Sequence, residues 1–326
     1  MKAIVYTKYG PPDVLQFKEV EKPSPKDGEI LVKIHAASVN ALDRHALRSR
    51  PFLIRIISGN GLRKPKDPRL GADIAGRVEA VGTNVTQFQP GDEVFGVVTA
   101  GGFAEYACAA ENQLALKPAN SSFEAAAAVP VAALTALQGL RDTGQIQPGQ
   151  KVLIHGASGG VGTFAVQIAK AFGAEVTAVC STRNVDMARS IGADHVIDYT
   201  QADFTKSGET YDVIFDVVGK SSFTRSVRSL THNGRYLLGN SRLSQRVRGR
   251  RMSRRSSKQV ILWKARTASE YTEDFKFLKE LIEAGKIQSV IDRCYPLEQT
   301  AQAHRYVDTG QKKGNVVITV DQNDNT

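Results

Sequence analysis

Cysteines and long apolar runs are both scarce in this sequence. Only three of its 326 residues are cysteines, and Cys108, Cys180 and Cys294 lie far apart along the chain. Their isolation excludes a disulfide framework, and the lack of a CxxC pair excludes the common structural zinc sites. No stretch approaches the roughly 18 consecutive apolar residues of a membrane-spanning helix, and the first residues lack the apolar core of a signal peptide. We therefore expect a globular protein of the reducing cytoplasm.

The net charge of +10 is concentrated in one segment. Residues 242–258 contain seven arginines, one lysine and no acid, so the rest of the chain is close to neutral. On a helix, a basic stripe would form from residues that recur every four positions: Arg242, Arg246, Arg250, Arg254 and Lys258. The segment has few large apolar residues and no aromatic ones. It predicts either a solvated insertion or a weak, salt-sensitive contact with an anionic membrane, RNA or acidic partner.

The length and the changing pattern along the chain predict two domains. Up to about residue 120, short segments rich in β-branched and aromatic residues alternate with turn formers such as Pro90-Gly91, which predicts a compact, barrel-like β domain. An alanine-rich helix (124–140) then leads into alternating strands and helices, typical of a doubly wound parallel sheet. A last strand (316–320) falls outside this alternation. We expect a β-rich domain of residues 1–124 with 268–326, and an α/β domain of residues 125–267.

A glycine-rich loop joins the first predicted α/β strand to an apolar helix. It reads Ala157-x-Gly159-x-x-Gly162, a dinucleotide-binding pattern with alanine in place of the first glycine. Gly159 would let the backbone approach a pyrophosphate, Gly162 would let the helix pack closely on the strand, and the helix N-terminus would offer N–H groups. We expect the whole loop to contact the cofactor: Ala157, Ser158, Gly159, Gly160, Val161 and Gly162.

The same loop also matches the nucleophile elbow of α/β-hydrolases, Gly156-x-Ser158-x-Gly160. Residues that could complete a triad lie downstream: His195, His232, His304, Asp212 and Asp216. However, an elbow normally follows several alternating strands and helices, whereas this loop opens the series, and Gly162 has no role in an elbow. The hydrolase and a purely structural glycine turn are the weaker interpretations.

The residues after the second α/β strand indicate which nicotinamide cofactor binds. A site specific for NAD places an acid there, bonded to the adenosine ribose. This chain has Ser181, Thr182 and Arg183 instead, which can bond and neutralise a phosphate. The sequence therefore favours NADPH, unless Arg183 is simply a solvated residue.

Several motifs resemble the medium-chain dehydrogenase/reductase superfamily, and within it the zinc-independent, zeta-crystallin-like quinone oxidoreductases. They are residues 37–43, 71–76, 101–106, 155–170 and 192–199. The resemblance covers nearly the whole chain; the segment 241–258 is its least familiar part. It implies a GroES-like catalytic domain, a Rossmann domain, a cleft between them that holds NADPH, and a homodimer.

The resemblance also bears on zinc. Zinc-dependent relatives carry a cysteine at the position of Asn40 and Gly-His-Glu at the position of Gly71-Ala72-Asp73, and they have a four-cysteine lobe that this chain lacks. The residues present offer no tetrahedral ligand set, so we expect no catalytic metal. Without a Lewis acid, a quinone or an α,β-unsaturated carbonyl is a better acceptor than a plain ketone.

Individual residues take roles from the resemblance. Asn40 and Asp43 match residues that contact the nicotinamide or orient the site, and His45 could donate a proton to the substrate; turn chemistry and a surface position are the alternatives. Thr135 matches a threonine near the carboxamide, and Tyr199 a tyrosine that reaches the ribose phosphate. Further candidates stand at strand ends: Val218, Gly219, Leu238, Gly239, Asn240 and, more weakly, Asn315.

These features together predict a zinc-free, NADPH-dependent oxidoreductase that reduces small electrophiles, either quinones or activated α,β-unsaturated carbonyls, by hydride transfer. Reduction of enoyl thioesters by the same fold is the nearest alternative. A non-catalytic role in binding anions or RNA through residues 242–258 is the alternative of a different class, since zeta-crystallin relatives show that such roles occur.

Overall fold

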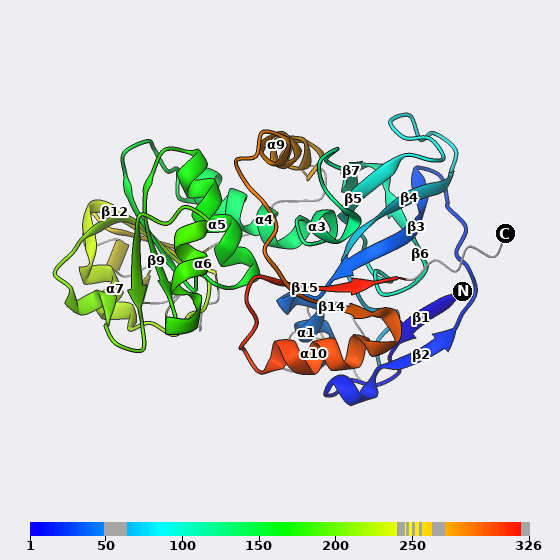
Figure 1. Cartoon of the computed structure of the whole chain (residues 1–326), viewed down its shortest axis with the longest axis horizontal. Helices are drawn as coiled ribbons and strands as arrows, with labels where there is room; N and C mark the ends of the chain where they lie inside the picture. The colour runs from blue at the N-terminus through cyan, green and yellow to red at the C-terminus, as the bar shows by residue number, and fades with distance from the viewer. Residues whose placement is uncertain are drawn as a thin grey trace. The chain divides into compact units, whose positions relative to one another are not determined.

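The computed structural model describes residues 1–48, 64–239, 245, 248–249, 252–253, 256–262 and 271–320. Contacts divide the chain into two compact units, each with its own sheet (Figure 1). The first unit contains Met1–Val131, Thr267–Glu283 and Ser289–Thr326, and the second contains Ala132–Arg266 and Ala284–Gln288. Within the described ranges, no helix is long and apolar enough to cross a membrane.

The first unit is built on a mainly antiparallel sheet with strand order β14-β15-β3-β4-β5-β7. Its strands are β3 (Glu29–Ser38), β4 (Asp73–Val81), β5 (Glu93–Val97), β7 (Leu114–Leu116), β14 (Ile291–Pro296) and β15 (Asn315–Thr319), with β6 (Tyr106–Ala110) paired to β3. A separate pair is β1 (Lys2–Val5) and β2 (Gln16–Glu19). The long strand β3 organises the unit because it pairs with β15, β4 and β6.

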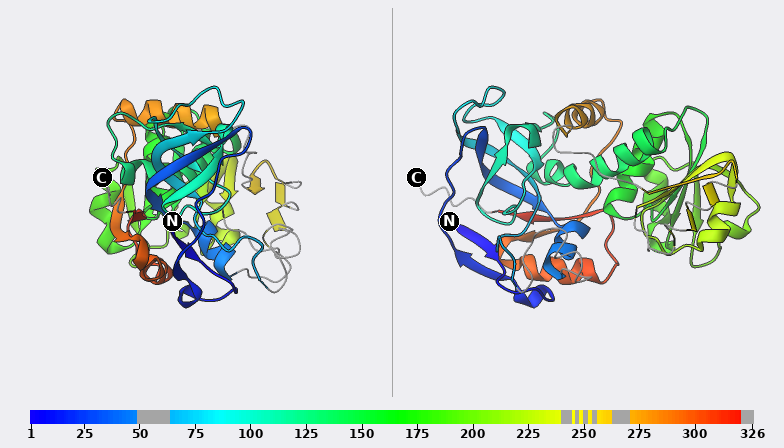
Figure 2. Two further views of the ribbon diagram at one scale, coloured as in Figure 1. Left: turned by 90° about the vertical axis from the view of Figure 1, so that its right-hand side faces the viewer. Right: turned by 180° about the vertical axis from the view of Figure 1, so that it is seen from behind.

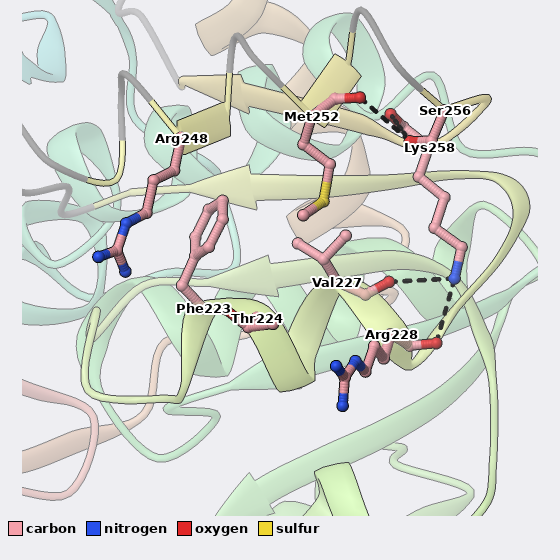
Figure 3. A pocket seen from close by; sticks show the side chains of 8 residues that line it. All are labelled: Phe223, Thr224, Val227, Arg228, Arg248, Met252, Ser256 and Lys258. Atoms are coloured by element: carbon pink, nitrogen blue, oxygen red, sulfur yellow. Dashed lines mark hydrogen bonds between the residues drawn. The ribbon is translucent and has the colours of Figure 1, made fainter.

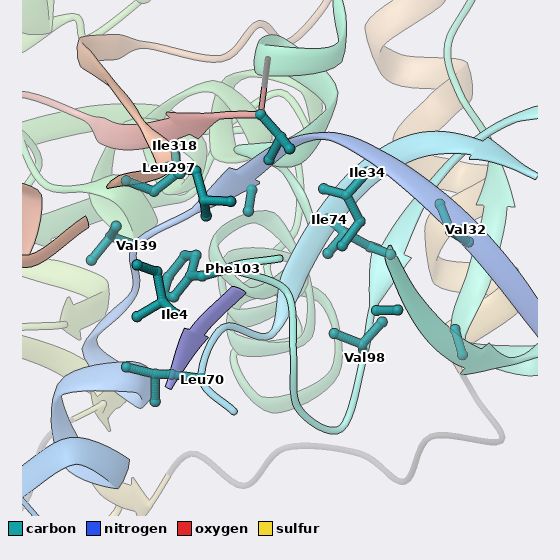
Figure 4. Packing of buried hydrophobic residues seen from close by; sticks show 14 of the residues in the cluster. Ile4, Val32, Ile34, Val39, Leu70, Ile74, Val98, Phe103, Leu297 and Ile318 are labelled. Atoms are coloured by element: carbon teal, nitrogen blue, oxygen red, sulfur yellow. The ribbon is translucent and has the colours of Figure 1, made fainter. Parts of the chain in front are cut away.

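The two ends of the described chain meet in this unit. Strand β15 pairs antiparallel with β3, as expected for a last strand outside the α/β alternation. Helix α10 (Thr300–Asp308) lies beside the N-terminal segment in both Figure 1 and Figure 2, and Arg305 Nε donates a 3.0 Å hydrogen bond to Asp13 there. The core beneath draws side chains from both ends of the chain, including Ile4, Phe103 and Ile318 (Figure 4). Burying each such side chain contributes roughly 1.5–3 kcal/mol.

The second unit is a parallel sheet with strand order β10-β9-β8-β11-β12-β13. Its strands are β8 (Lys151–His155), β9 (Glu175–Cys180), β10 (His195–Asp198), β11 (Tyr211–Asp216), β12 (Leu230–Leu238) and β13 (Gln259–Leu262). Helices α5 (Gly160–Ala171), α6 (Val185–Ser190) and α7 (Phe223–Arg228) connect them. This is the doubly wound Rossmann order, in which the direction of strand addition reverses between β8 and β11. The predicted fold class is confirmed.

Three sequence predictions about elements need correction. The alanine-rich helix (124–140) is divided into α3 (Phe123–Ala127), α4 (Pro130–Leu137) and the π-helical η3 (Gln138–Thr143). Pro130 causes the first break, because it lacks an N–H and disfavours helical geometry in the preceding residue. Strand β14 was not predicted, since Ile-Asp-Arg-Cys-Tyr-Pro alternates poorly. The two aromatic residues in the segment 103–107 predict a strand there, but the strand, β6, spans Tyr106–Ala110.

Two further elements match their predictions closely. Residues 41–70 predict a loop with one or two helical turns, and helix α1 (Ala41–Arg48) lies at the start of this region. The apolar periodicity of residues 273–284 predicts a helix, which is α9 (Tyr271–Glu283). Of the five residues in the predicted basic stripe, only Lys258 is described; Arg242, Arg246, Arg250 and Arg254 lie outside the described residues.

Candidate functional site

The loop between β8 and α5 has the backbone geometry of a phosphate-binding turn. Gly156 adopts φ +91°, in the left-handed region that favours glycine. A Cβ on Gly162 would lie 2.1 Å from the Gly156 carbonyl oxygen, so only glycine fits where the helix meets the strand. A Cβ on Gly159 would meet only that oxygen, at 3.7 Å. Gly156 and Gly162 are thus required by the fold, whereas Gly159 leaves open space beside its backbone.

The N-terminus of α5 is available to an anion. Gly159 is its N-cap and provides no side-chain cap, so the first N–H groups of this twelve-residue helix have no side-chain acceptor from the cap. Ala157 and Gly160 are buried, whereas Ser158, Gly159 and Val161 are partly accessible. The open space at Gly159 and the uncapped helix end fit the pyrophosphate of a dinucleotide.

A buried carboxylate, Asp216, ties together the ends of the three central strands. It accepts hydrogen bonds from His155 Nδ1 (2.9 Å) on β8 and from the Tyr236 hydroxyl (2.9 Å) on β12. The backbone N–H groups of Val218 (3.1 Å) and Gly219 (2.7 Å) donate to it too, as does the Ser221 hydroxyl (2.7 Å). Although burial opposes ionisation, these donors lower the pKa of Asp216 to about 2.

This network places two predicted cofactor residues and weakens the hydrolase interpretation. Val218 and Gly219 are held at the carboxyl edge of the sheet, beside the reversal of strand order where ligands of such sheets bind. The histidine partner of Asp216 is His155, which precedes the loop, and not one of the three downstream histidines. Among those, His195 bonds Glu175 (3.0 Å), and no hydrogen bond joins Ser158 to a described histidine. The described residues therefore form no triad with Ser158.

The structure brings Ser181, Thr182, Arg183 and Tyr199 to the neighbouring ends of β9 and β10. The Tyr199 N–H donates to the Cys180 carbonyl (3.0 Å), and its side chain is 60% exposed. Asp198, which was not predicted as a site residue, also belongs to this group. Its carboxylate accepts a 2.6 Å hydrogen bond from Thr182 Oγ1, and that bond, with others from Thr200 and Gln201, lowers the pKa of Asp198. Thr182 already has an acid as its partner.

In the first unit, Asn40, Asp43 and Asp73 form a buried polar cluster. Asn40 Nδ2 donates to Asp73 Oδ2 (2.8 Å), and the Asn40 backbone N–H donates to Asp43 Oδ2 (2.7 Å). Asp73 Oδ2 also accepts from the Val131 N–H (3.0 Å), while its Oδ1 is buried without a hydrogen bond. Burial raises the pKa of Asp43 to about 7, and burial raises that of Asp73 well above its usual range, with Asp43 adding to the effect.

Asp43 opens onto a pocket of about 150 Å³ within the first unit. Tyr6, whose pKa burial raises to about 12, also lines this pocket, as do Asp67 and Arg69. Arg69 and Asp67 make a two-bond ion pair (2.9 and 2.7 Å). Tyr6, Asp67 and Arg69 are not predicted as site residues, because nothing in the local sequence pattern indicates that role. His45 is exposed on α1 and does not line this pocket.

The remaining predicted residues are scattered. Thr135 is half-buried on α4 and Leu238 is buried at the end of β12, next to the exposed Gly239. Asn315 belongs to the first unit, where its side-chain amide donates to the Val290 carbonyl (3.3 Å). The predicted cofactor residue Asn240 lies outside the described residues.

Comparison with known proteins identifies the family. Residues 26–119 match the alcohol dehydrogenase GroES-like domain, and residues 191–318 match a family described as zinc-binding dehydrogenase. Quinone oxidoreductase of Sus scrofa is 35% identical over 315 residues, which cover 93% of each chain. The chain belongs to the quinone oxidoreductase family of the medium-chain dehydrogenase/reductase superfamily. The predicted resemblance is confirmed, and the protein is an oxidoreductase of this superfamily.

Solved structures agree with this assignment. Escherichia coli quinone oxidoreductase complexed with NADPH superposes with a TM-score of 0.83 at 27% identity, covering 98% of this chain and all (100%) of that one. The CurK enoyl reductase superposes with a TM-score of 0.88 at 26% identity, covering 98% and 99%. A nicotinamide cofactor is thus supported for this fold. No group of three or more His, Cys, Asp or Glu side chains able to hold a metal occurs in the part of the chain that the structure describes.

Proposed function

We propose that this oxidoreductase uses NADPH and no metal to reduce small electrophiles, either quinones or activated α,β-unsaturated carbonyls, by hydride transfer. The observation that carries the proposal is the β8–α5 turn, where a glycine backbone and an uncapped helix end leave room for a pyrophosphate. The name of the Sus scrofa relative supports quinones as acceptors.

For the cofactor, support comes from residues at the ends of β9 and β10. Ser181 and Arg183 supply a hydroxyl and a cation where an NAD site would supply an acid. Tyr199 is exposed beside them, and the Escherichia coli structure contains NADPH. Asp198 opposes this preference, because its charge would repel the extra phosphate. We propose that Arg183 and the loop outweigh it.

For catalysis without zinc, support comes from the bond between Asn40 and Asp73. An amide, a methyl group and one carboxylate stand where zinc-dependent relatives carry thiolate, imidazole and carboxylate, and this set suits Zn²⁺ poorly. Asp73 with a raised pKa is stable as a neutral acid, which needs no cation to balance it. The family described as zinc-binding is matched by residues 191–318, so Asn40, Ala72 and Asp73 lie outside that match.

The acceptor chemistry follows from what the first unit's pocket offers. When bound, reduced nicotinamide supplies the hydride. Asp43 and Tyr6 line the pocket; their raised pKa values leave Tyr6 protonated and Asp43 about half protonated at neutral pH. Such donors can stabilise the oxygen of an enolate or hydroquinone, but they give a plain ketone much less help than a Lewis acid. Asn40 orients Asp43 through its backbone N–H, and His45 remains an exposed candidate donor on α1.

The test is NADPH oxidation measured with matched acceptors: benzoquinones, enones, enoyl thioesters and the corresponding saturated ketones. We expect turnover with quinones or enones and none with the saturated ketones. Turnover confined to plain ketones and alcohols would overturn the proposal. Enoyl thioesters as the sole acceptors would favour the second candidate, which the likeness to the CurK enoyl reductase supports. Absence of turnover with all acceptors would leave the non-catalytic binding role.

We also propose a cytoplasmic homodimer. All three cysteines are free, which fits a reducing compartment. Among the described strands, β13 pairs only with β12; its Val260 N–H already donates to Ser253, and we propose that a second copy pairs with the rest of this edge. Sedimentation analysis of the purified protein tests the dimer, and a monomer at micromolar concentration would contradict it.

A further inference from the structure

A second pocket lies in the Rossmann unit and belongs to none of the sites above. Its volume is about 540 Å³, within the range of small-molecule sites. Helix α7 forms one wall and the segment before β13 forms the other (Figure 3). The lining residues are Phe223, Thr224, Val227, Arg228, Arg248, Met252, Ser256 and Lys258. None of the predicted cofactor residues that the structure describes lines it.

The pocket has an apolar floor. Phe223 and Val227 are 7% and 2% exposed and belong to the core cluster of the sheet, against which Met252 packs. Figure 3 shows the Met252 side chain pointing from the opposite wall toward Phe223 and Val227. An alkyl chain or a ring placed between these walls would lose water on both sides, and apolar burial would stabilise it there.

The described residues of the rim are cationic and include no acid. Lys258 Nζ donates to the carbonyls of Val227 and Arg228 (3.1 Å each), so its charge is directed at the C-terminal end of α7. Arg228 and Arg248 are exposed, and no described carboxylate pairs with either. By contrast, the neighbouring Arg225 has Asp203 as its partner at 3.3 Å. The guanidinium groups of Arg228 and Arg248 therefore lie beside an apolar cavity and have no anionic partner among the described residues.

The far wall is fixed to the sheet. The Ser253 hydroxyl accepts a 2.9 Å hydrogen bond from the Val260 N–H of β13, and Ser256 Oγ donates to the Met252 carbonyl (3.2 Å). Gly249 lies so close to Val260 that a Cβ there would be 2.7 Å from its side chain. These contacts set Arg248 and Met252 opposite α7, so the described wall residues are placed by the fold.

From this arrangement we infer that the pocket binds one amphipathic carboxylate, such as a medium-chain fatty acid, with its alkyl chain on Phe223, Val227 and Met252 and its carboxylate on Arg228 and Arg248. A guanidinium is the group best suited to a carboxylate, which it can bind through two parallel hydrogen bonds. Nucleic acid fits poorly, since Phe223, the one aromatic ring among the described lining residues, is buried and cannot stack on bases. This site is independent of the cofactor and of the proposed acceptors.

The test is calorimetric titration of the whole protein with decanoate, acetate and decanamide. Decanoate should bind at one site per chain, and acetate (no alkyl chain) and decanamide (no charge) should each bind at least tenfold more weakly. Arg248→Gln and Arg228→Gln should each weaken decanoate binding about tenfold, the usual effect of one lost charge-assisted bond. Met252→Asp should abolish decanoate binding, because it places an acid beside the alkyl chain. Arg189→Gln removes an exposed arginine of the same unit and should change nothing.

The outcomes are separable from those for the proposed function. NADPH oxidation and the melting temperature should be unchanged in the arginine variants. These variants therefore test the site even if Met252→Asp does not fold. Absence of decanoate binding, or equal binding in wild type and both arginine variants, would overturn the inference. Binding to anionic phosphatidylserine vesicles or heparin that these variants lose, without decanoate binding, would overturn it too, because a surface contact would then explain the charges.

Discussion

Thr182 donates a 2.6 Å hydrogen bond to Asp198, across the ends of strands β9 and β10. An acid therefore lies beside the residues predicted to bind the phosphate of NADPH, although it comes from the third strand of the sheet and not from the second. The donors around Asp198 lower its pKa, so it is charged at neutral pH. Under the proposed function, we expect Arg183 and Asp198 to act in opposite directions on the preference for NADPH.

The first prediction tests this opposition. NADPH should bind more tightly than NADH, and Arg183→Ala should weaken NADPH binding while leaving NADH binding nearly unchanged. Asp198→Asn should tighten NADPH binding a few-fold, because it removes an exposed negative charge near the phosphate and solvent screens that charge. Fluorescence titration of the wild type and of each variant measures the affinities for both cofactors. Glu209→Gln, an exposed acid that pairs with Lys151, is the control. Equal changes for both cofactors would contradict the assignment.

The second prediction concerns metal. Purified protein should contain far less than one zinc per chain, and EDTA should leave quinone or enone reduction unchanged, because Asn40 donates to Asp73 and offers no thiolate ligand to zinc. Elemental analysis and assays before and after chelation provide the measurement. The control is the same treatment applied to a zinc-dependent alcohol dehydrogenase, which should lose activity. Activity lost with EDTA and restored by Zn²⁺ would refute the prediction.

The third prediction follows from the raised pKa of Asp43. The folded state holds this proton up to a pKa of about 7, whereas the unfolded chain releases it near 3.8. The folded state thus binds more protons between these values, so the free energy of unfolding falls as pH rises from about 4 to 7 and is then level. The shift corresponds to at most about 4 kcal/mol.

Asp43→Asn should therefore make stability less dependent on pH in that window, with Asp73 still contributing in the same direction. Urea unfolding at pH 4.5, 6 and 7.5 measures the slope. Asp186→Asn, at a side chain that is fully exposed (100%), should leave the slope as in wild type. A variant slope equal to that of wild type would show that Asp43 is not the group responsible.

The sequence predicts those parts of the fold and site that depend on local pattern. The alternation after residue 150 gives the parallel sheet, and the spacing of Gly159 and Gly162 gives the loop, because a turn of this kind needs particular residues at fixed positions. Contacts between distant segments are not predictable in the same way. The bond from His155 to Asp216 joins residues 61 positions apart, and that from Asn40 to Asp73 joins residues 33 apart.

Even so, a usable sequence signal existed for three residues of the site in the second unit. His155, Asp198 and Asp216 are each the last residue of a predicted or observed parallel strand. Carboxyl ends of parallel strands share one edge of the sheet, so polar residues at those positions meet regardless of their separation in sequence. No comparable rule applied to Tyr6 or Arg69, which reach the first unit's pocket from irregular segments.

The last prediction separates the structural glycine from the functional one in the β8–α5 turn. Gly162→Ala would force a Cβ to within 2.1 Å of the Gly156 carbonyl, so it should destabilise the protein without cofactor by several kcal/mol, in the manner of an overpacked core. Gly159→Ala meets nothing closer than 3.7 Å and has an extended backbone (φ −85°), so the cofactor-free protein should keep its melting temperature. Its methyl group would, however, occupy the space left for the pyrophosphate, and NADPH binding should weaken at least tenfold. Thermal melts with and without NADPH measure both effects. The control is Gly285→Ala, at a glycine outside this turn. Its φ is +67° and a Cβ there would meet nothing within 4 Å, so only backbone strain of about 1 kcal/mol is expected. Unchanged NADPH binding in Gly159→Ala would show that the turn is a structural feature and not a cofactor site.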